Sequence, residues 1–408
     1  MTSTYEPSRE ILDRYADLLV NYALGGGAGI KPGDVVRIAA EESAKPLYTA
    51  CRRAVHAAGG HVLSAYRPNS RDQYSDRAED FYANATEEQL DFFPEKYMRG
   101  LAETIDHSLS IISEYDKHAL KEVDPNKIMR GGIASKPFSD WLQSKESAGE
   151  FTWTLGLYGT PAAAAEAGLT LEEYWQQIIT ACFLDEEDPK ARWRQVATEI
   201  EEFKDKLNAL PIDTLHVSGS DSDLVIKLGE QRRWAGGSGR NIPSFEIFTS
   251  PDWRGTEGWI KFNQPLYRYG TLIEGVRLEF KEGKVVNATA SQGQEALTAM
   301  IATENADKIG EFSLTDSRHS RITKFMAETL YDENVGGRYG NTHLAVGKSY
   351  HDCFEGDPEA NDDQDWERLG FNNSSVHTDI VSTTDRTVVA TLTDGTEKVI
   401  YADGQFTL

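Results

Sequence analysis

The chain has 408 residues, of which 39% are hydrophobic and 26% charged, a globular composition that excludes the fibrous and disordered classes. This length is more than one hydrophobic core usually serves, so we expect two domains. The formal net charge of −24, with no cluster of lysine and arginine, argues against nucleic-acid binding and favours the attraction of cations.

Cysteine usage and hydropathy indicate a cytoplasmic protein. The three cysteines are widely separated and form no CxxC pair, which is typical of a reducing compartment. Residues 1–13 are polar and lack the apolar core of a signal peptide. No stretch approaches the roughly 18 apolar residues that a membrane-spanning helix needs. We therefore expect no membrane partner.

Strands and helices alternate in the first third of the chain. A strand is predicted over 35–39, a helix over 43–58 and a second strand over 61–65. This spacing predicts a parallel pair of strands with a crossover helix. The other elements expected here are strands at 111–112 and 151–157 and a helix over 137–147.

A helical block separates the two halves. Thr170 and Glu173 form a capping-box signature before a helix that runs to Phe183. A longer amphipathic helix is predicted from Asp188 to about residue 210. Its end is the expected boundary between an N-terminal α/β domain with a parallel sheet (1–210) and a C-terminal α+β domain with a mixed sheet (211–408).

Strands dominate from residue 215 onward, where short apolar runs alternate with turn residues. The expected strands are 224–228, 258–262, 276–280 and 285–290, the expected helices are 292–304 and 320–331, and the closing hairpin pairs 388–392 with 398–401.

Candidate metal ligands lie near the edges of these elements. His377 and Asp379 are two residues apart on a predicted strand, so their side chains point the same way and can converge on one centre. His343, in the segment 341–347, would be a third ligand. Judged from the residues alone, each histidine is more often an ordinary polar residue than a ligand.

Three glutamates stand in unusual local sequence. Glu246 is flanked by Phe245 and Ile247 in a short predicted strand, where an unpaired charge is costly. Glu311 begins a predicted strand, and Glu333 follows a predicted helix. Each of the three can also be read as a plain surface carboxylate, so the residues alone leave both readings open.

Five segments, taken in order, resemble the thermophilic-aminopeptidase family of metallopeptidases, peptidase family M29. They are Asn241-x-Pro-x-x-Glu-x-Phe-Thr-x-Pro251, Glu304-Asn-Ala-Asp-x-x-Gly-Glu311, Leu330-Tyr-Asp-Glu-Asn334, His343-x-Ala-x-Gly-x-x-Tyr350 and Val376-His-x-Asp379. Segments 32–36 and 167–174 also resemble parts of the family's first domain, so the resemblance covers most of the chain.

The resemblance implies a metal-dependent aminopeptidase that acts on peptides with a free N-terminus, forms a homodimer and carries its metal in the C-terminal catalytic domain. It implies these metal ligands: Glu246, Glu311, Glu333, His343, His377 and Asp379. Four carboxylates would balance two divalent cations, and mixed oxygen and nitrogen ligands suit zinc, cobalt or manganese.

The implied mechanism is hydrolysis by a water that two metal ions acidify. We expect Glu311 to bridge the ions or to lie closest to the shared water, from where it could carry a proton to the leaving amine. The resemblance makes Tyr350 catalytic, and its phenol can donate a hydrogen bond to the tetrahedral oxyanion.

One spacing departs from the family pattern. Ten positions separate Glu333 from His343, where many family members have fewer, and glycines in this segment permit a longer loop. His319 and His351 lie near the candidate ligands in sequence, but we expect neither to bind metal.

Two alternatives stay open. His343, His377 and Asp379 alone would form the two-histidine, one-carboxylate set of a mononuclear iron ring-cleaving dioxygenase on the same scaffold. Such an enzyme would not need three further glutamates. The other alternative is a non-catalytic metal-stabilised relative, which the presence of all six candidate ligands argues against.

Overall fold

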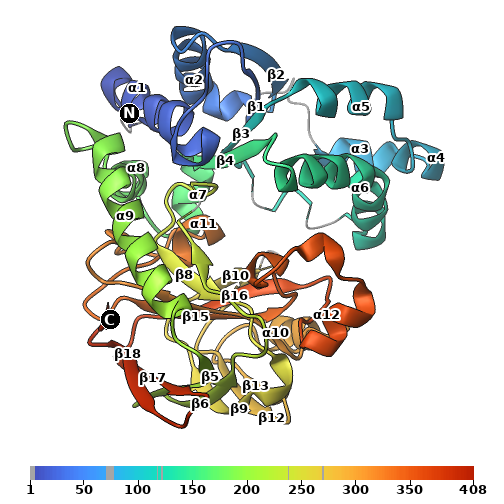
Figure 1. Ribbon diagram of the computed structural model, residues 1–408. Helices are drawn as coiled ribbons and strands as arrows, with labels where there is room; N and C mark the ends of the chain where they lie inside the picture. The colour runs from blue at the N-terminus through green and yellow to red at the C-terminus, as the bar shows by residue number, and fades with distance from the viewer. Residues whose placement is uncertain (1–4, 70–77, 117, 121–122, 238, 269–270) are drawn as a thin grey trace. The chain divides into compact units, whose positions relative to one another are not determined.

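The computed structural model describes residues 5–69, 78–116, 118–120, 123–237, 239–268 and 271–408. The chain divides into two compact units, each traced in Figure 1. The first comprises Met1–Arg192 with Ser238–Pro243, and the second comprises Trp193–Gly237 with Ser244–Leu408. Each unit has its own sheets, which are described separately.

The first unit is built on a four-stranded parallel sheet with strand order β2-β1-β3-β4. The strands are β1 (Val35–Glu41), β2 (His61–Arg67), β3 (His107–Ile112) and β4 (Thr152–Leu157). Helix α2 (Lys45–Ala57) connects β1 to β2, so the predicted parallel pair with a crossover helix is confirmed.

Helices cover both faces of this sheet: Figure 1 shows α1 (Arg9–Leu18) and α2 on one side and α5 (Glu95–Thr104) and α6 (Pro125–Ser147) on the other. The other helices are α3 (Ala78–Asn84), α4 (Glu87–Leu90), α7 (Pro161–Glu166) and α8 (Leu171–Ala181), and α9 (Pro189–Asn208) continues into the second unit. The predicted capping box is present at α8, where the Thr170 hydroxyl accepts from the Glu173 N–H at 3.2 Å.

The helix predicted over 137–147 begins twelve residues earlier, at Pro125, so its predicted start is wrong. The Asp124 carboxylate caps this helix by accepting from the Asn126 N–H at 2.9 Å. Pro125 takes the first helical position, where a missing N–H costs nothing. Pro137, the predicted start, lies inside the same helix.

The second unit contains an eight-stranded antiparallel sheet with strand order β13-β12-β9-β6-β5-β17-β18-β19. Its strands are β5 (Ile212–Gly219), β6 (Ser222–Lys227), β9 (Glu257–Lys261), β12 (Arg277–Lys281), β13 (Lys284–Thr289), β17 (Arg386–Leu392), β18 (Glu397–Ala402) and β19 (Gln405–Phe406). The predicted closing hairpin is confirmed as the β17–β18 pair.

A five-stranded sheet with order β16-β15-β14-β8-β7 accompanies it, and β10 (Leu266–Arg268) pairs with β11 (Thr271–Ile273). The five strands are β7 (Ala235–Gly236), β8 (Glu246–Thr249), β14 (Ile309–Thr315), β15 (Asn341–Gly347) and β16 (His377–Ser382). The buried Arg386 joins the two large sheets, because it pairs with Asp221 at 3.2 Å and donates to the Thr342 hydroxyl at 2.7 Å.

The mixed sheet predicted for the C-terminal half is wrong: the ladders between its described strands are antiparallel. Short turns join β5 to β6, β12 to β13 and β17 to β18. A turn of a few residues permits only antiparallel pairing, because a parallel pair requires a long crossover connection.

The helix predicted over 320–331 is also wrong, since only α11 (Thr329–Asp332) is α-helical there. The Asp332 carboxylate accepts the N–H groups of Met326 at 2.7 Å and Glu328 at 2.9 Å. The backbone of this segment therefore finds its hydrogen-bond partners in a side chain instead of a helical ladder. The other helices of the unit are α10 (Gln294–Ile301) and α12 (Asp363–Leu369).

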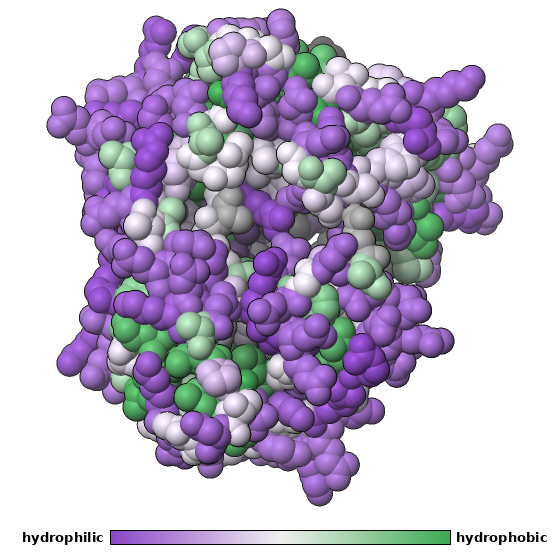
Figure 2. Space-filling model, viewed as in Figure 1, coloured by the Kyte–Doolittle hydropathy of each residue, from purple (hydrophilic) through white to green (hydrophobic). Residues whose placement is uncertain are grey.

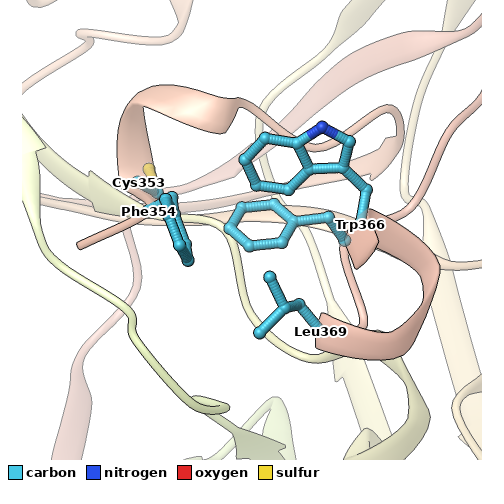
Figure 3. Close-up of a cluster of buried hydrophobic side chains, with 5 residues drawn as sticks. Cys353, Phe354, Trp366 and Leu369 are labelled. Atoms are coloured by element: carbon cyan, nitrogen blue, oxygen red, sulfur yellow. The ribbon is translucent and has the colours of Figure 1, made fainter. Parts of the chain in front are cut away.

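A cluster of buried apolar side chains fixes the segment that follows β15. It consists of Cys353, Phe354, Trp366, Leu369 and Phe371, and Phe248 of β8 packs against it. Figure 3 shows the labelled side chains directed toward one another, with Trp366 and Leu369 coming from α12. Packing against Phe248 holds this segment beside the five-stranded sheet.

The molecular surface agrees with the charge of the chain. Hydrophilic residues dominate the face seen in Figure 2, as a formal net charge of −24 leads one to expect. Within the described ranges, no helix combines the length and the apolar character needed to cross a membrane.

Candidate metal centre

The register of the five-stranded sheet gathers the candidate ligands on one face. Glu311 of β14 lies opposite Ala345 of β15, which lies opposite Asp379 of β16. Residues two apart on a strand share a face, so His343 and His377 point the same way as Glu311 and Asp379. The period-two argument made from the sequence for His377 and Asp379 thus extends across three strands.

Glu246 reaches the same face from the other side of β14. It is the first residue of β8 and pairs with Thr315, which is four residues after Glu311 on β14. Only 9% of Glu246 is exposed, and the Ser244 hydroxyl donates to its Oε1 at 3.3 Å.

His343 lies at the middle of this face and is 1% exposed. Its Nε2 is 3.1 Å from Glu311 Oε1, 3.3 Å from Glu246 Oε2 and 3.9 Å from Asp379 Oδ1. Glu246, Glu311 and His343 each offer a donor atom within 4.8 Å of the others, so these three buried residues can hold a metal ion.

His377 faces the same carboxylates from β16. Its Nε2 is 3.4 Å from Asp379 Oδ1 and 3.8 Å from Glu311 Oε2. Its Nδ1 is 2.7 Å from the Lys348 carbonyl, which can only accept, so Nδ1 carries a proton and Nε2 faces the carboxylates. The two oxygens of Glu311 thus face different imidazoles.

Glu333 approaches from outside the sheet, as the C-terminal cap of α11. The Asn334 side-chain amide donates to its Oε1 at 3.4 Å. Burial, together with the charges of Glu246 and Asp379, raises the pKa of Glu333 well above its usual value. The repulsion from Glu246 and Asp379 requires Glu333 to lie near those two carboxylates.

The candidate ligands lie close enough together for their negative charges to shift one another's pKa values. Burial, then the charges of Asp379 and Glu246, raise the pKa of Glu311 to about 7 despite its hydrogen bond to His343. Burial favours a neutral His377, but the Asp379 carboxylate outweighs it and raises the pKa of His377 to about 9. Without a cation, this face stabilises itself by holding protons.

The pKa values of His343 and Asp379 are also shifted by their charged neighbours. Burial disfavours the imidazolium of His343, yet hydrogen bonds to Glu246 and Glu311 raise its pKa well above the usual value. Burial would raise the pKa of Asp379, but the charge of His377 lowers it to about 2. Divalent cations would replace these protons, so the donor set fits metal.

Tyr350 lies three residues beyond β15, at the edge of the cluster. Its ring centroid is 4.5 Å from that of His377 and 6.1 Å from that of Phe248. Its N–H donates to the Ser250 hydroxyl at 2.8 Å, which fixes the backbone. Burial and the nearby carboxylates, Glu311 first, raise its pKa, so the phenol is protonated at neutral pH.

The other two histidines near these segments are engaged elsewhere. His319 is buried and places Nε2 2.7 Å from Glu199 Oε2. His351 stacks on Trp366 with ring centroids 3.7 Å apart. The motif analysis gave no role to Ser244, Asn334 or Asn341, which contact ligand residues. Asn341 is two residues before His343 on the same strand, and this spacing could have indicated that the two side chains share a face.

A buried set of carboxylates and imidazoles has the donor chemistry of a divalent-metal centre, which defines the class of protein. The family model of the thermophilic metalloproteases (M29) matches residues 8–406. The chain belongs to this family, as the motifs predicted, and it is therefore a metallopeptidase, a hydrolase that depends on a divalent metal.

Individual relatives match over most of their length. Aminopeptidase T of Thermus thermophilus is 31% identical over 347 residues, which cover 79% of this chain and 83% of that protein. Aminopeptidase 2 of Geobacillus stearothermophilus is 27% identical over 417 residues, 97% of each chain. The solved structure of wild-type AmpT from Thermus thermophilus superposes with a TM-score of 0.80 at 25% identity, covering 98% of this chain and 100% of that one.

Metal affinity should rise with pH, because a cation competes with the protons on this face. Glu311 and His377 bind protons below pH values of about 7 and about 9 and must release them to bind a cation. We expect zinc affinity to increase at least about tenfold from pH 6 to pH 8, measured by competition with a chelator of known pH dependence. An affinity that stays constant or falls over this range would contradict the protonation described here.

Proposed function

We propose that this protein is a metal-dependent aminopeptidase that releases N-terminal amino acids from peptides and uses two divalent cations, zinc, cobalt or manganese. The observation that best supports this proposal is the position of Glu311 between two histidines. Its Oε1 is 3.1 Å from His343 Nε2, and its Oε2 is 3.8 Å from His377 Nε2. A carboxylate that faces two nitrogen donors in this way is suited to bridge two ions.

The residues that would hold the two ions are Glu246, Glu311, Glu333, His343, His377 and Asp379, with Glu311 facing both histidines. With Glu333, the set contains four carboxylates and two neutral imidazoles. Its negative charge would balance that of two divalent cations. Bound divalent ions would lower the pKa of a water to about 7 and polarise the scissile carbonyl.

The chain's own residues supply the proton transfers and the orientation. With metal bound, the Glu311 carboxylate would be ionised and could take the proton that the nucleophilic water releases and pass it to the leaving amine. The Tyr350 phenol stays protonated and can donate a hydrogen bond to the tetrahedral oxyanion.

The comparisons favour the aminopeptidase prediction over the dioxygenase alternative. Relatives that span most of this chain are aminopeptidases, and the family is one of metallopeptidases. A mononuclear iron site made of His343, His377 and Asp379 alone would also leave Glu246 and Glu311 as buried carboxylates without a purpose, at a high cost in desolvation.

We also propose the finer organisation that the sequence suggested. Residues 211–408 would form the metal-binding catalytic domain and residues 1–210 an N-terminal domain. The protein would be a cytoplasmic homodimer acting on peptides. Size-exclusion chromatography with light scattering tests the dimer.

The activity can be tested on aminoacyl-p-nitroanilides with added zinc or cobalt. We expect release of p-nitroaniline that a chelator abolishes, and no cleavage of N-acetylated substrates, which lack the free amino group. Glu311→Gln should lower kcat at least about a thousandfold, because it removes the proton carrier and a metal ligand together. Circular dichroism should show the variant folded.

His319→Gln is the matched control, since it changes a buried histidine engaged with Glu199 and should keep kcat within a few-fold. The proposal is overturned by chelator-insensitive turnover, by near wild-type rates in Glu311→Gln, or by one tightly held iron per chain.

Tyr350→Phe should lower kcat by about a hundredfold or more, the usual effect of removing one oxyanion donor. KM should change little, because the lost hydrogen bond forms only as the oxyanion develops. The phenylalanine ring keeps the contacts of Tyr350 with His377 and Phe248, so the melting temperature should hardly move. An unchanged kcat would assign Tyr350 to packing against His377 instead.

A further inference from the structure

Two buried asparagines stand at the ends of the loop that separates Glu333 from His343. Asn334 begins the loop and Asn341 ends it as the first residue of β15, and neither side chain is exposed. This loop is the segment whose length departs from the family pattern, so its closure decides where Glu333 lies.

Asn341 connects the two candidate ligands that flank the loop. Its side-chain amide donates to the Glu333 carbonyl at 2.6 Å, and this contact fixes its Oδ1 as an acceptor. His343 is two residues away on the same strand and shares its face. Within the described part of the chain, Asn341 Oδ1 and His343 Nδ1 are both buried without a protein hydrogen-bond partner.

Asn334 connects Glu333 to the strand that carries Glu246. Its Oδ1 accepts the N–H of Phe245, the residue before Glu246, at 2.7 Å. Its side-chain amide donates to the Leu330 carbonyl at 3.3 Å and to Glu333 Oε1 at 3.4 Å. One side chain thus contacts both the backbone of one candidate ligand's strand and the carboxylate of another.

The backbone around the two asparagines is closely packed. The Ser320 hydroxyl donates to the Asn334 carbonyl at 2.5 Å, and the Gly336 N–H donates to the Ile322 carbonyl at 2.7 Å. Gly340 has a φ of 57°, and a Cβ there would lie 2.2 Å from the Thr315 carbonyl oxygen. The loop therefore has one tight path to β15, and the asparagines hold both of its ends.

We propose that Asn334 and Asn341 are positioning residues that fix Glu333 and His343 for metal binding, an inference that rests on the proposed metal centre. An amide is suited to this task because it is neutral. It donates to a carboxylate or carbonyl without adding charge to a site that already contains four carboxylates. An aspartate has nearly the same shape but reverses the donor into an acceptor.

The test compares Asn334→Asp and Asn341→Asp with the wild type in the metal-free and zinc-loaded states. Each variant should lose about 10- to 100-fold in zinc affinity, the usual cost of an outer partner of a metal ligand. The added buried charge should also lower the metal-free melting temperature by several degrees, so zinc affinity is compared at a temperature at which each metal-free variant is folded. With saturating metal, kcat should fall while KM holds, a split that a general loss of structure would not give.

Asn208→Asp is a control for the chemistry of the substitution at an exposed site, because the Asn208 side-chain amide also donates to a main-chain carbonyl, that of Trp234, at 3.2 Å. It should keep wild-type zinc affinity. Equal affinity in all variants, or an equal loss in the control, overturns the positioning role. Failure of the wild type itself to bind zinc or cleave aminoacyl substrates overturns the proposed function instead.

A measurement on the wild type covers the case in which a variant does not fold. Zinc should slow hydrogen exchange of the backbone amides over 334–341 at least tenfold, because metal bound to Glu333 and His343 holds both ends of the loop. Exchange that zinc leaves unchanged in this segment contradicts the proposal without any substitution.

Discussion

Three carboxylates meet on one buried face of an antiparallel sheet, and a fourth, Glu333, approaches from outside it. Their mutual repulsion is the constraint on which the candidate metal centre depends. Five of the six candidate ligands sit on strands β8, β14, β15 and β16, whose ladders keep them from separating. The face must therefore bind protons or cations. The pKa of Glu311 is raised to about 7 and that of His377 to about 9, so bound protons reduce the repulsion in the metal-free protein. Divalent cations would also reduce this repulsion, and they would support hydrolysis.

Small residues between the ligands keep the face open. Ser313 lies opposite His343 and Ala345 lies between Glu311 and Asp379, so no large side chain fills the space where their donor atoms converge. Gly347 lets β15 approach β16 closely, since a Cβ there would lie 2.0 Å from the Val376 carbonyl oxygen. The neighbouring Lys348 carbonyl then orients His377, so the backbone selects the imidazole nitrogen that faces the carboxylates.

The sequence predicted features that depend on local periodicity. A period of two placed His377 and Asp379 on one face, and the capping box began α8 where expected. It missed features that depend on contacts between distant residues. The Asp332 carboxylate replaces a helical ladder before α11, and the roles of Asn334 and Asn341 follow from a loop closure that no motif encodes. The mixed sheet was mispredicted because apolar runs do not specify the direction of pairing.

Anomalous diffraction from crystals grown with zinc tests the central claim most directly. The account predicts two zinc peaks per chain within the set of six candidate ligands, with Glu311 beside both. A single peak held by His343, His377 and Asp379, with Glu246 and Glu311 turned away, would contradict it.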